Sequence, residues 1–440
     1  MIAPVSTQKE NTPRTSATAL LPPGVLLPFT LVTGLFFLWA IPNNLNDILI
    51  RQFMKSFALT RLQGGLVQSA FYLGYFLFAL PAGILMKHYG YKPGFLTGLL
   101  LFASGCFLFL PATNSGKYIF FLGALFVIAS GLAFLETASN PFITQLGPTA
   151  TSEARLNLAQ AFNPIGAITG SLVGTVFIFS GIELSPAQVQ SMQSAGTYAA
   201  YLHSEALRTR APYMVLGSLA LLWTVFIALT RFPAFIQNRE HAAESTGNWR
   251  HLLSERHFLL ADIAQFFYVG AQVGTWSYFI QYAKDYGHTT DKTAGLLLTG
   301  TLGAFGIGRF ASAALMRRFA PSRMMTLYAL INIILVTVGI FIHNWTGLIA
   351  ILLTSFFMSV MFPTIFALGL KDLGPNTNIA GSFLVMAIIG GAVLTPIMGA
   401  MHTTASAYTV PLVSYLVVIA FSHYMTTYRS KRLANSTFDV

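Results

Sequence analysis

The sequence predicts an all-α membrane protein with twelve transmembrane helices in two six-helix halves. Of its 440 residues, 54% are hydrophobic and only 9% are charged, whereas soluble domains have about 25% charged residues. Apolar runs of about 20 residues, the length that crosses a bilayer, recur along the whole chain. A long polar stretch near the middle divides them six and six. This composition excludes a soluble enzyme, a disordered protein and a nucleic-acid-binding protein, despite the net charge of +11.

The apolar runs are predicted to be helices because they are long and lack the alternation of a barrel strand. They are expected near residues 24–50, 62–86, 95–112, 118–140, 158–180, 212–232, 258–282, 293–316, 324–343, 346–370, 380–402 and 409–427. The predicted domains are a tail (1–23), a first bundle (24–232), a linker (233–257), a second bundle (258–427) and a second tail (428–440). The first run is too long for a signal peptide, so no cleavage is expected.

The distribution of basic residues predicts the orientation. With both termini in the cytoplasm, seventeen of the 25 lysines and arginines lie on the cytoplasmic side and eight lie outside. Because cytoplasmic loops are rich in these residues, both tails are expected in the cytoplasm and the chain in the cell's inner (plasma) membrane. The polar stretch 181–211 is then expected outside. One cysteine, Cys106, excludes a disulfide framework; neither a metal nor a cofactor is predicted, and a monomer is expected.

The two halves resemble each other. Residues 85–89 (LMKHY) and 315–319 (LMRRF) both end an even-numbered span, 230 residues apart. Phe36-Phe37 likewise aligns with Phe266-Phe267. Parallel six-span repeats around a site near the midplane are typical of secondary transporters.

Only two carboxylates are predicted to lie well within the spans, Asp47 and Glu136. A charge at the bilayer centre costs on the order of 3 kcal/mol on insertion scales. A buried carboxyl group takes up a proton readily, so the pair is predicted to couple transport to protons. The alternative for each acid is a structural hydrogen bond between helices, or a position at the membrane interface, which applies more to Asp47 near its span end.

Amides and tryptophans accompany these acids at helical spacing. Amides offer both hydrogen-bond donors and acceptors, and an indole ring offers a flat apolar face, a combination that suits a sugar. The alternative is that the amides only hold helices together, but three converging spans favour a lined cavity. The predicted substrate-binding residues are Trp39, Asn43, Asn44, Gln160, Asn163, Gln272 and Trp276.

Two further groups in the spans have structural interpretations. Glycines repeat in span five (Gly166, Gly170, Gly174) and in span eight (Gly295, Gly300, Gly303, Gly306, Gly308). Both sets are predicted to allow close helix packing, and their spacing does not fit a phosphate loop. Arg309 is interpreted either as a gate residue that pairs with an acid or as a side chain that reaches the interface.

Several longer motifs make the chain recognisable. They are residues 39–49 (WAIPNNLNDIL), 68–72 (QSAFY), 135–142 (LETASNPF), 155–163 (RLNLAQAFN), 268–278 (YVGAQVGTWSY) and 363–366 (PTIF). These resemble the fucose–galactose–glucose:proton symporter family of the major facilitator superfamily, over residues 25–425. The string Asn-Asn-Leu-Asn-Asp at 43–47 favours the L-fucose permease branch of that family.

The resemblance implies a major facilitator fold and the import of a monosaccharide, L-fucose first, together with a proton. It implies proton-coupling roles for Asp47 and Glu136, and a polar sugar wall formed by Asn44, Gln160 and Asn163 with Trp39 and Trp276 as apolar lining. Asp47 is expected nearer the outside and Glu136 nearer the inside, which predicts serial protonation. Phe362, where the family pattern has tyrosine, and Pro42 depart from the pattern.

The sequence is compatible with other functions. The same fold can carry another hexose or pentose (galactose, glucose, arabinose), or act as a uniporter. A membrane sugar sensor would normally bring a sizeable soluble domain, and the tails are short. An intramembrane hydrolase would need the two acids as a close dyad. Their surroundings are amide-rich and contain no catalytic motif, so no enzyme activity is predicted.

Overall fold

The computed structural model describes residues 24–147, 158–232, 252–316, 318–371 and 376–436, together with residues 21, 155 and 373. Within these ranges the protein is helical and contains no strand. Most of the predicted first tail, most of the predicted linker and the last four residues lie outside the described residues.

The first half begins with a helix that runs unbroken through Pro42. Two predicted spans of this half are interrupted or extended: span three continues as α4, and span five ends in a short π-helix, η2. The predicted polar stretch 181–211 holds two short helices, the first of which begins with a Ser185–Gln188 capping box. The elements are α1 (Leu26–Ser56), α2 (Arg61–Tyr89), α3 (Tyr91–Phe107), α4 (Phe109–Ser115), α5 (Tyr118–Gln145), α7 (Phe162–Val173), η2 (Gly174–Ile178), α8 (Pro186–Ser194), α9 (Tyr198–Leu207) and α10 (Arg210–Leu229).

The second half repeats this plan. Its last helix continues past the predicted end at residue 427, because the polar sequence that follows contains no glycine or proline to stop it. The elements are α13 (Arg256–Ser277), α14 (Phe279–Gly287), α15 (Asp291–Leu315), α16 (Pro321–Phe341), α17 (Trp345–Met358), α18 (Met361–Gly369), α19 (Thr377–Met386), η4 (Ala387–Ile389), α20 (Gly390–Ala400), α21 (Thr404–Ala407) and α22 (Thr409–Ser436).

Eleven candidate membrane spans are found among the described residues by length and apolarity. The predicted seventh span, which α13 and α14 form, is not one of the eleven. Asp262, Gln265 and Gln272 make α13 more polar than the other spans. Helices α13 and α14 nevertheless cover the predicted span 258–282.

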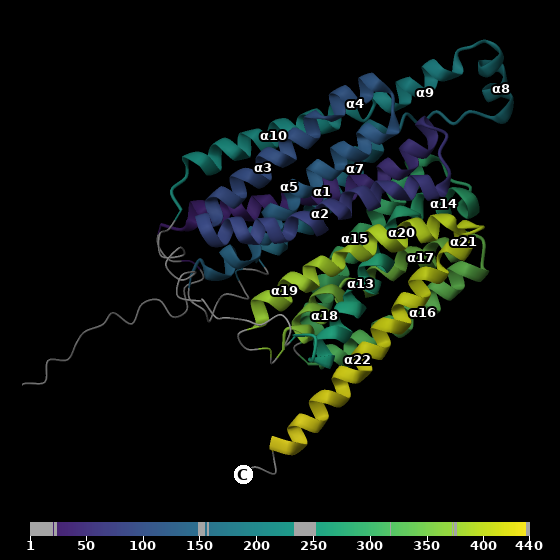
Figure 1. The fold of residues 1–440 in the computed structure, drawn as a ribbon. Coiled ribbons are helices and arrows are strands. Elements are labelled where there is room, and N and C mark those ends of the chain that lie inside the picture. The colour runs from purple at the N-terminus through teal and green to yellow at the C-terminus, as the bar shows by residue number, and fades with distance from the viewer. Residues whose placement is uncertain are drawn as a thin grey trace, which may run out of the picture.

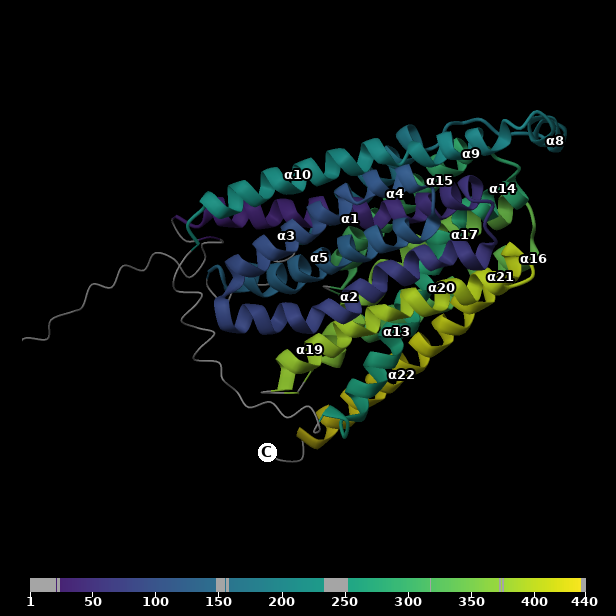
Figure 2. The same cartoon turned by 45° about the horizontal axis from the view of Figure 1, so that its top comes forward.

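The two halves lie close together at one end and diverge toward the other (Figure 1). We call the end with α8, α9, α14 and α21 the loop end, and the end at which α1 begins and α22 finishes the terminal end. Within the first half α2 and α3 pack on α5, and α1 packs on α7; within the second, α22 packs on α13 and α16. Between the halves, α2 packs on α20 (Figure 2), and α7 packs on α15.

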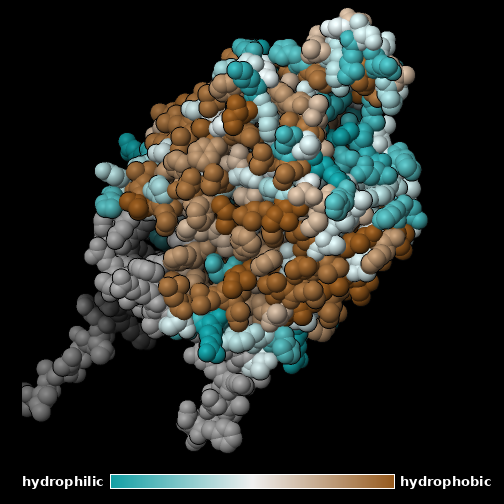
Figure 3. Space-filling view, turned by 45° about the vertical axis from the view of Figure 1, so that its right-hand side comes forward, coloured by the Kyte–Doolittle hydropathy of each residue, from teal (hydrophilic) through white to brown (hydrophobic). Residues whose placement is uncertain are grey.

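The outer surface of the bundle is apolar. Phe341 is 76% exposed and Ile307 is 67% exposed, which in water would leave large hydrophobic side chains unburied. Figure 3 shows hydrophobic residues over most of one face, with hydrophilic residues gathered toward the loop end. This distribution fits a bundle surrounded by lipid.

Close helix contacts explain the glycines of span five. A side chain at Gly166 would meet the backbone oxygen of Phe37, and one at Gly170 would meet that of Ile41. The predicted packing role is therefore confirmed, with α1 as the partner helix. In span eight it is confirmed at Gly308, which approaches the backbone of Phe356.

The same prediction is wrong for two glycines of span eight. Apart from the backbone of their own helix and their chain neighbours, no described atom lies within 4 Å of the position that a side-chain carbon would take at Gly300 or at Gly303. Gly300 is exposed, and neither glycine lines the cavity that other residues of α15 face, so no neighbouring helix requires a glycine at these two positions.

We predict that Gly170→Ala destabilises the fold by about 1–3 kcal/mol, because the added methyl group must push α1 away from α7. The measurement is the melting temperature of the detergent-purified protein. Gly303→Ala is the matched control, since its methyl group enters open space in α15. Equal melting temperatures for the two variants would contradict the prediction.

Candidate functional site

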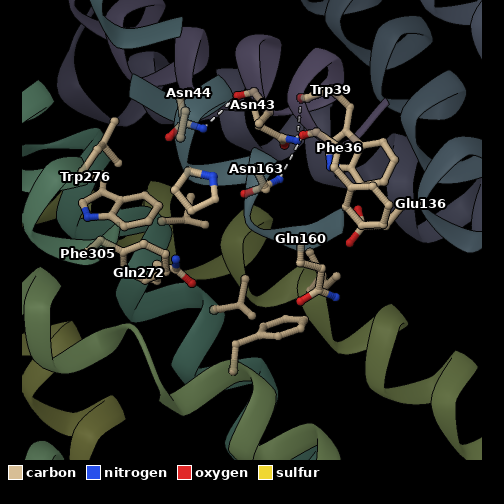
Figure 4. Close-up of a pocket in the computed structure, with 18 of the residues that line it drawn as sticks. Phe36, Trp39, Asn43, Asn44, Glu136, Gln160, Asn163, Gln272, Trp276 and Phe305 are labelled. Atoms are coloured by element: carbon tan, nitrogen blue, oxygen red, sulfur yellow. Dashed lines mark hydrogen bonds between the residues drawn. The ribbon is translucent and has the colours of Figure 1, made fainter. Parts of the chain in front are cut away.

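A cavity of about 480 Å³ lies between the two halves and is lined by both of them (Figure 4). All nine residues that the sequence analysis selected line it. They are Trp39, Asn43, Asn44 and Asp47 on α1, Glu136 on α5, Gln160 and Asn163 at the start of span five, and Gln272 and Trp276 on α13. The helices thus bring together residues that are up to 237 positions apart in the chain, from 39 to 276.

The two walls of the cavity differ in chemistry. The first half supplies almost all of the polar side chains. The second half supplies mainly apolar ones, with Gln272 and Arg309 as its polar members. The lining residues that the sequence analysis did not select include Gln68, Tyr72, Tyr75, Asn140, Phe305, Phe366, Val385 and Ile388. A sugar has hydroxyl groups at its rim and C–H groups on its faces, so it can satisfy both walls at once.

Asp47 is 3% exposed and is held from both halves. Its Oδ1 accepts a hydrogen bond from Gln68 Nε2 on α2 at 3.0 Å and one from Ser277 Oγ on α13 at 2.9 Å. Gln68 Nε2 also lies 3.0 Å from Ser277 Oγ. The three polar groups therefore form a small junction between the halves at the cavity edge.

Glu136 is half-buried and faces the hydroxyl end of Tyr75. Asn43 Nδ2 lies 3.4 Å from the Tyr75 hydroxyl oxygen and donates to the backbone oxygen of Trp39 at 3.1 Å. Asn43 therefore positions the tyrosine that contacts Glu136. Asp47 and Glu136 line one cavity but have different hydrogen-bond partners, which argues against a shared-proton dyad.

The amides of the first half each use a nitrogen within the protein. Asn44 Nδ2 donates to the backbone oxygen of Ala40 at 2.8 Å, and Gln160 Nε2 donates to Asn140 Oδ1 at 3.4 Å. These bonds leave the carbonyl oxygens of Asn44 and Gln160 to accept from a ligand hydroxyl.

Both tryptophans are fixed in orientation. Trp39 packs on Phe36, with ring centroids 4.4 Å apart. Trp276 donates from its indole nitrogen to Ser355 Oγ at 2.9 Å, and its ring packs edge-on against Phe305. With its nitrogen bonded to the protein, Trp276 presents an apolar ring to the cavity.

Two charged residues differ from expectation. Arg309 lines the cavity and lies 5.1 Å above the Phe305 ring centre. No acid pairs with Arg309 among the described residues, so the gate pair, one of its two interpretations, is not found there. Asp262 on α13 is a third carboxylate inside a predicted span, contrary to the expectation of two; it does not line the cavity.

Ion pairs between the halves close the loop end. Arg51 of α1 pairs with Asp291 of α15 at 2.8 Å. Lys284 of α14 pairs with the same Asp291 at 2.9 Å and with Glu183 of the first half at 2.8 Å. Arg61 of α2 donates to the backbone oxygen of Met401 at 2.8 Å. Among the described residues, the two halves are hydrogen-bonded to each other from the cavity edge to the loop end. The cavity is therefore shut on that side.

Comparison with known proteins gives the family. The family model of the Major Facilitator Superfamily matches residues 29–396. The L-fucose-proton symporter of Escherichia coli (strain K12) is 45% identical over 410 residues, which cover 91% of this chain and 93% of that protein. A putative glucose/galactose transporter of Helicobacter pylori (strain J99) is 35% identical, with 89% and 95% covered.

A solved structure agrees with these sequence relatives. The crystal structure of the major facilitator transporter FucP in the outward conformation has a TM-score of 0.70 and 44% identity, covering 91% of this chain and 99% of that one. The fold and the cavity between two six-helix halves define a membrane transporter of the alternating-access type. The chain belongs to the major facilitator superfamily and, within it, to the family of the L-fucose-proton symporter to which it is similar.

Proposed function

We propose that this protein is a secondary active transporter that imports a monosaccharide, L-fucose, together with a proton. The observation that carries this proposal is the cavity itself, in which two acids and an amide-rich wall face an apolar wall. The 45% identity to the L-fucose-proton symporter of E. coli supports the sugar and the coupled ion. The relatives and the fold are those of transporters, and the protein is not an enzyme.

The proposed orientation puts both termini in the cytoplasm and the loop end outside, with the chain in the inner membrane as a monomer. The excess of basic residues near the termini and linker supports it. Residues 24–232 and 258–427 are proposed as the two moving bundles, joined by a cytoplasmic linker. With the loop end shut by Arg51, Asp291 and Lys284, this is a state with its outer side closed.

In the proposed cycle, sugar binds from outside to amide groups of the first half while an apolar face rests on Trp276 and Phe305. Proton uptake by the acids removes the charge that opposes closure of the cavity. The halves then rock, the outer side closes, and sugar and proton leave toward the cytoplasm. The proton drives net import because it binds the two states with different affinity.

Asp47 and Glu136 are proposed to act in series. Asp47 lies on α1 beyond the substrate amides in the direction of the loop end, whereas Glu136 lies on α5 past the middle of the helix toward the terminal end. Asp47 would therefore receive the proton from outside, and Glu136 would release it inside.

Purified protein in liposomes tests the function. We expect labelled L-fucose to accumulate against its gradient only when the outside is more acidic than the inside, and a protonophore to abolish this accumulation. Gradient-driven uptake of galactose or glucose in place of L-fucose would support the proposed proton coupling and show that the proposed sugar is wrong. Equal uptake with and without a pH gradient would identify a uniporter and contradict the proposed coupling.

The apolar wall is predicted to set the preference among sugars. Phe362 lines the cavity where the family pattern has tyrosine. We expect Phe362→Tyr to change the ratio of L-fucose to galactose inhibition constants up to about tenfold, because one added hydrogen bond contributes about 0.5–1.5 kcal/mol. Competition assays measure this ratio. Phe366→Tyr, on the same helix and in the same wall, controls for the mere addition of a hydroxyl group.

A further inference from the structure

We infer that Ser277 is a positioning residue that links closure of the outer side to the charge on Asp47. The inference rests on the proposed proton symport and deepens it. Asp47 belongs to the first half and Ser277 to the second, yet Ser277 Oγ donates to Asp47 Oδ1 at 2.9 Å. Ser277 is 3% exposed, so water does not replace this contact while the halves are together.

The contact exists only where the halves meet. Ser277 is the last residue of α13, and Tyr278, which follows it, donates to the backbone oxygen of Arg61 in the first half at 2.9 Å. On the first-half side, Gln68 Nε2 reaches both Asp47 Oδ1 and Ser277 Oγ. When the halves separate at the outer side, Asp47 keeps Gln68 as a donor and loses Ser277.

A hydrogen bond from a hydroxyl group is stronger to an ionised carboxylate than to a neutral acid. Through this bond, closure of the outer side supports the ionised form of Asp47 against the cost of burying its charge, and an ionised Asp47 strengthens the closed contact in return, because the two effects are reciprocal. The consequence is directional. Asp47 can therefore lose its proton while the outer side is shut behind the sugar, which a buried acid without the Ser277 donor would do less readily.

Other charged groups around Asp47 have partners of their own. On α1, Arg51 pairs with Asp291; from α9, Glu205 pairs with Lys55; on α2, Tyr75 contacts Asn43. Elements α7 and η2 contribute no titratable side chain. The remaining titratable groups that line the cavity are Tyr72 and Glu136 in the first half and Arg309 in the second half. Ser277 is thus the second-half residue that hydrogen-bonds Asp47 among the described residues.

The test compares Ser277→Ala with the full-length wild type in liposomes. We expect the internal pH for half-maximal L-fucose uptake to rise by about one unit in Ser277→Ala, since a group that favours the ionised acid has been lost. Sugar exchange at equal pH on both sides should continue, which shows that the variant folds. Ser277→Thr keeps a hydroxyl group and should restore the wild-type profile.

Ser414→Ala is the matched control, because Ser414 is also fully buried but bonds only to its own helix, at the Val410 backbone oxygen. Its pH profile should equal that of the wild type. A Ser277→Ala profile that coincides with that of Ser414→Ala would overturn the inference while leaving proton symport intact. Wild-type uptake that ignores the pH gradient would instead overturn the proposed function.

A distance measurement gives a readout that does not depend on transport. Spin labels at Lys117→Cys and Thr346→Cys report on the two halves at the loop end, where both positions are exposed. We expect Ser277→Ala to reduce the closed population at high pH but not at low pH. In an Asp47→Asn background, Ser277→Ala should have a smaller effect that does not depend on pH, because only a bond to a neutral oxygen is lost; equal effects in both backgrounds would overturn the inference.

Discussion

Replacing Glu136 by glutamine is expected to abolish sugar accumulation and to spare sugar exchange. The amide keeps the size and hydrogen-bonding capacity of a protonated acid next to Tyr75, so the sugar can still bind and the halves can still move. It cannot release a proton to the cytoplasm. A one-proton symporter at equilibrium accumulates sugar about tenfold per pH unit, and the variant should fall to a ratio of about one.

Two assays on one preparation separate these outcomes. Counterflow of labelled L-fucose between sugar-loaded liposomes and medium at equal pH measures exchange, and uptake under an inward proton gradient measures accumulation. Gln145→Glu would not be a neutral comparison, because Gln145 bonds Tyr91. Gln190→Glu on the exposed helix α8 changes charge away from the cavity and should behave as wild type. Undiminished accumulation by Glu136→Gln would refute the role given to this acid.

Replacing Asp47 by asparagine is expected to have an equally large effect with a different pH signature. Asparagine retains an oxygen that Gln68 and Ser277 can still approach, but it binds no proton from outside. Uptake should fall to the level seen without a gradient and lose its dependence on external pH. In Glu136→Gln, by contrast, the dependence on internal pH should be lost.

The two signatures test the serial order of the acids. External and internal pH are varied separately in the liposome assay for each variant, with L-fucose held constant. If both variants lose the same dependence, the two acids titrate as one unit and the serial scheme is wrong. Asp285→Asn serves as a control at the loop end, because Asp285 accepts from Thr404 and Gln281 and does not line the cavity.

Much of this protein could be predicted from its sequence because the bilayer imposes simple rules. A span must be long, apolar and helical, so the helices could be placed to within several residues of their observed bounds. Because burying a charge in the membrane is costly, Asp47 and Glu136 could be identified as functional candidates. Helical spacing predicted that Trp39, Asn43 and Asn44 share one face of α1. These properties depend on local sequence alone.

The sequence by itself determined the fold class, the two halves and the nine residues that prove to line one cavity. Only the tertiary structure decided what lies opposite them. The apolar wall of Phe305, Phe366 and Ile388 looks like ordinary membrane helix in sequence, because hydrophobic residues facing a cavity, lipid or another helix have the same composition. For the same reason, the sequence did not reveal that Gly303 opposes no other helix.

Pairing between the halves was the other feature that required the structure. Asp47 and Ser277 are 230 residues apart, as are Arg51 and Gln281, and no local pattern relates them. Their contact depends on how two separately packed bundles meet, and that arrangement changes during transport while the sequence does not. Helix identity is a local property, whereas the closure of the loop end is a property of the whole assembly of helices.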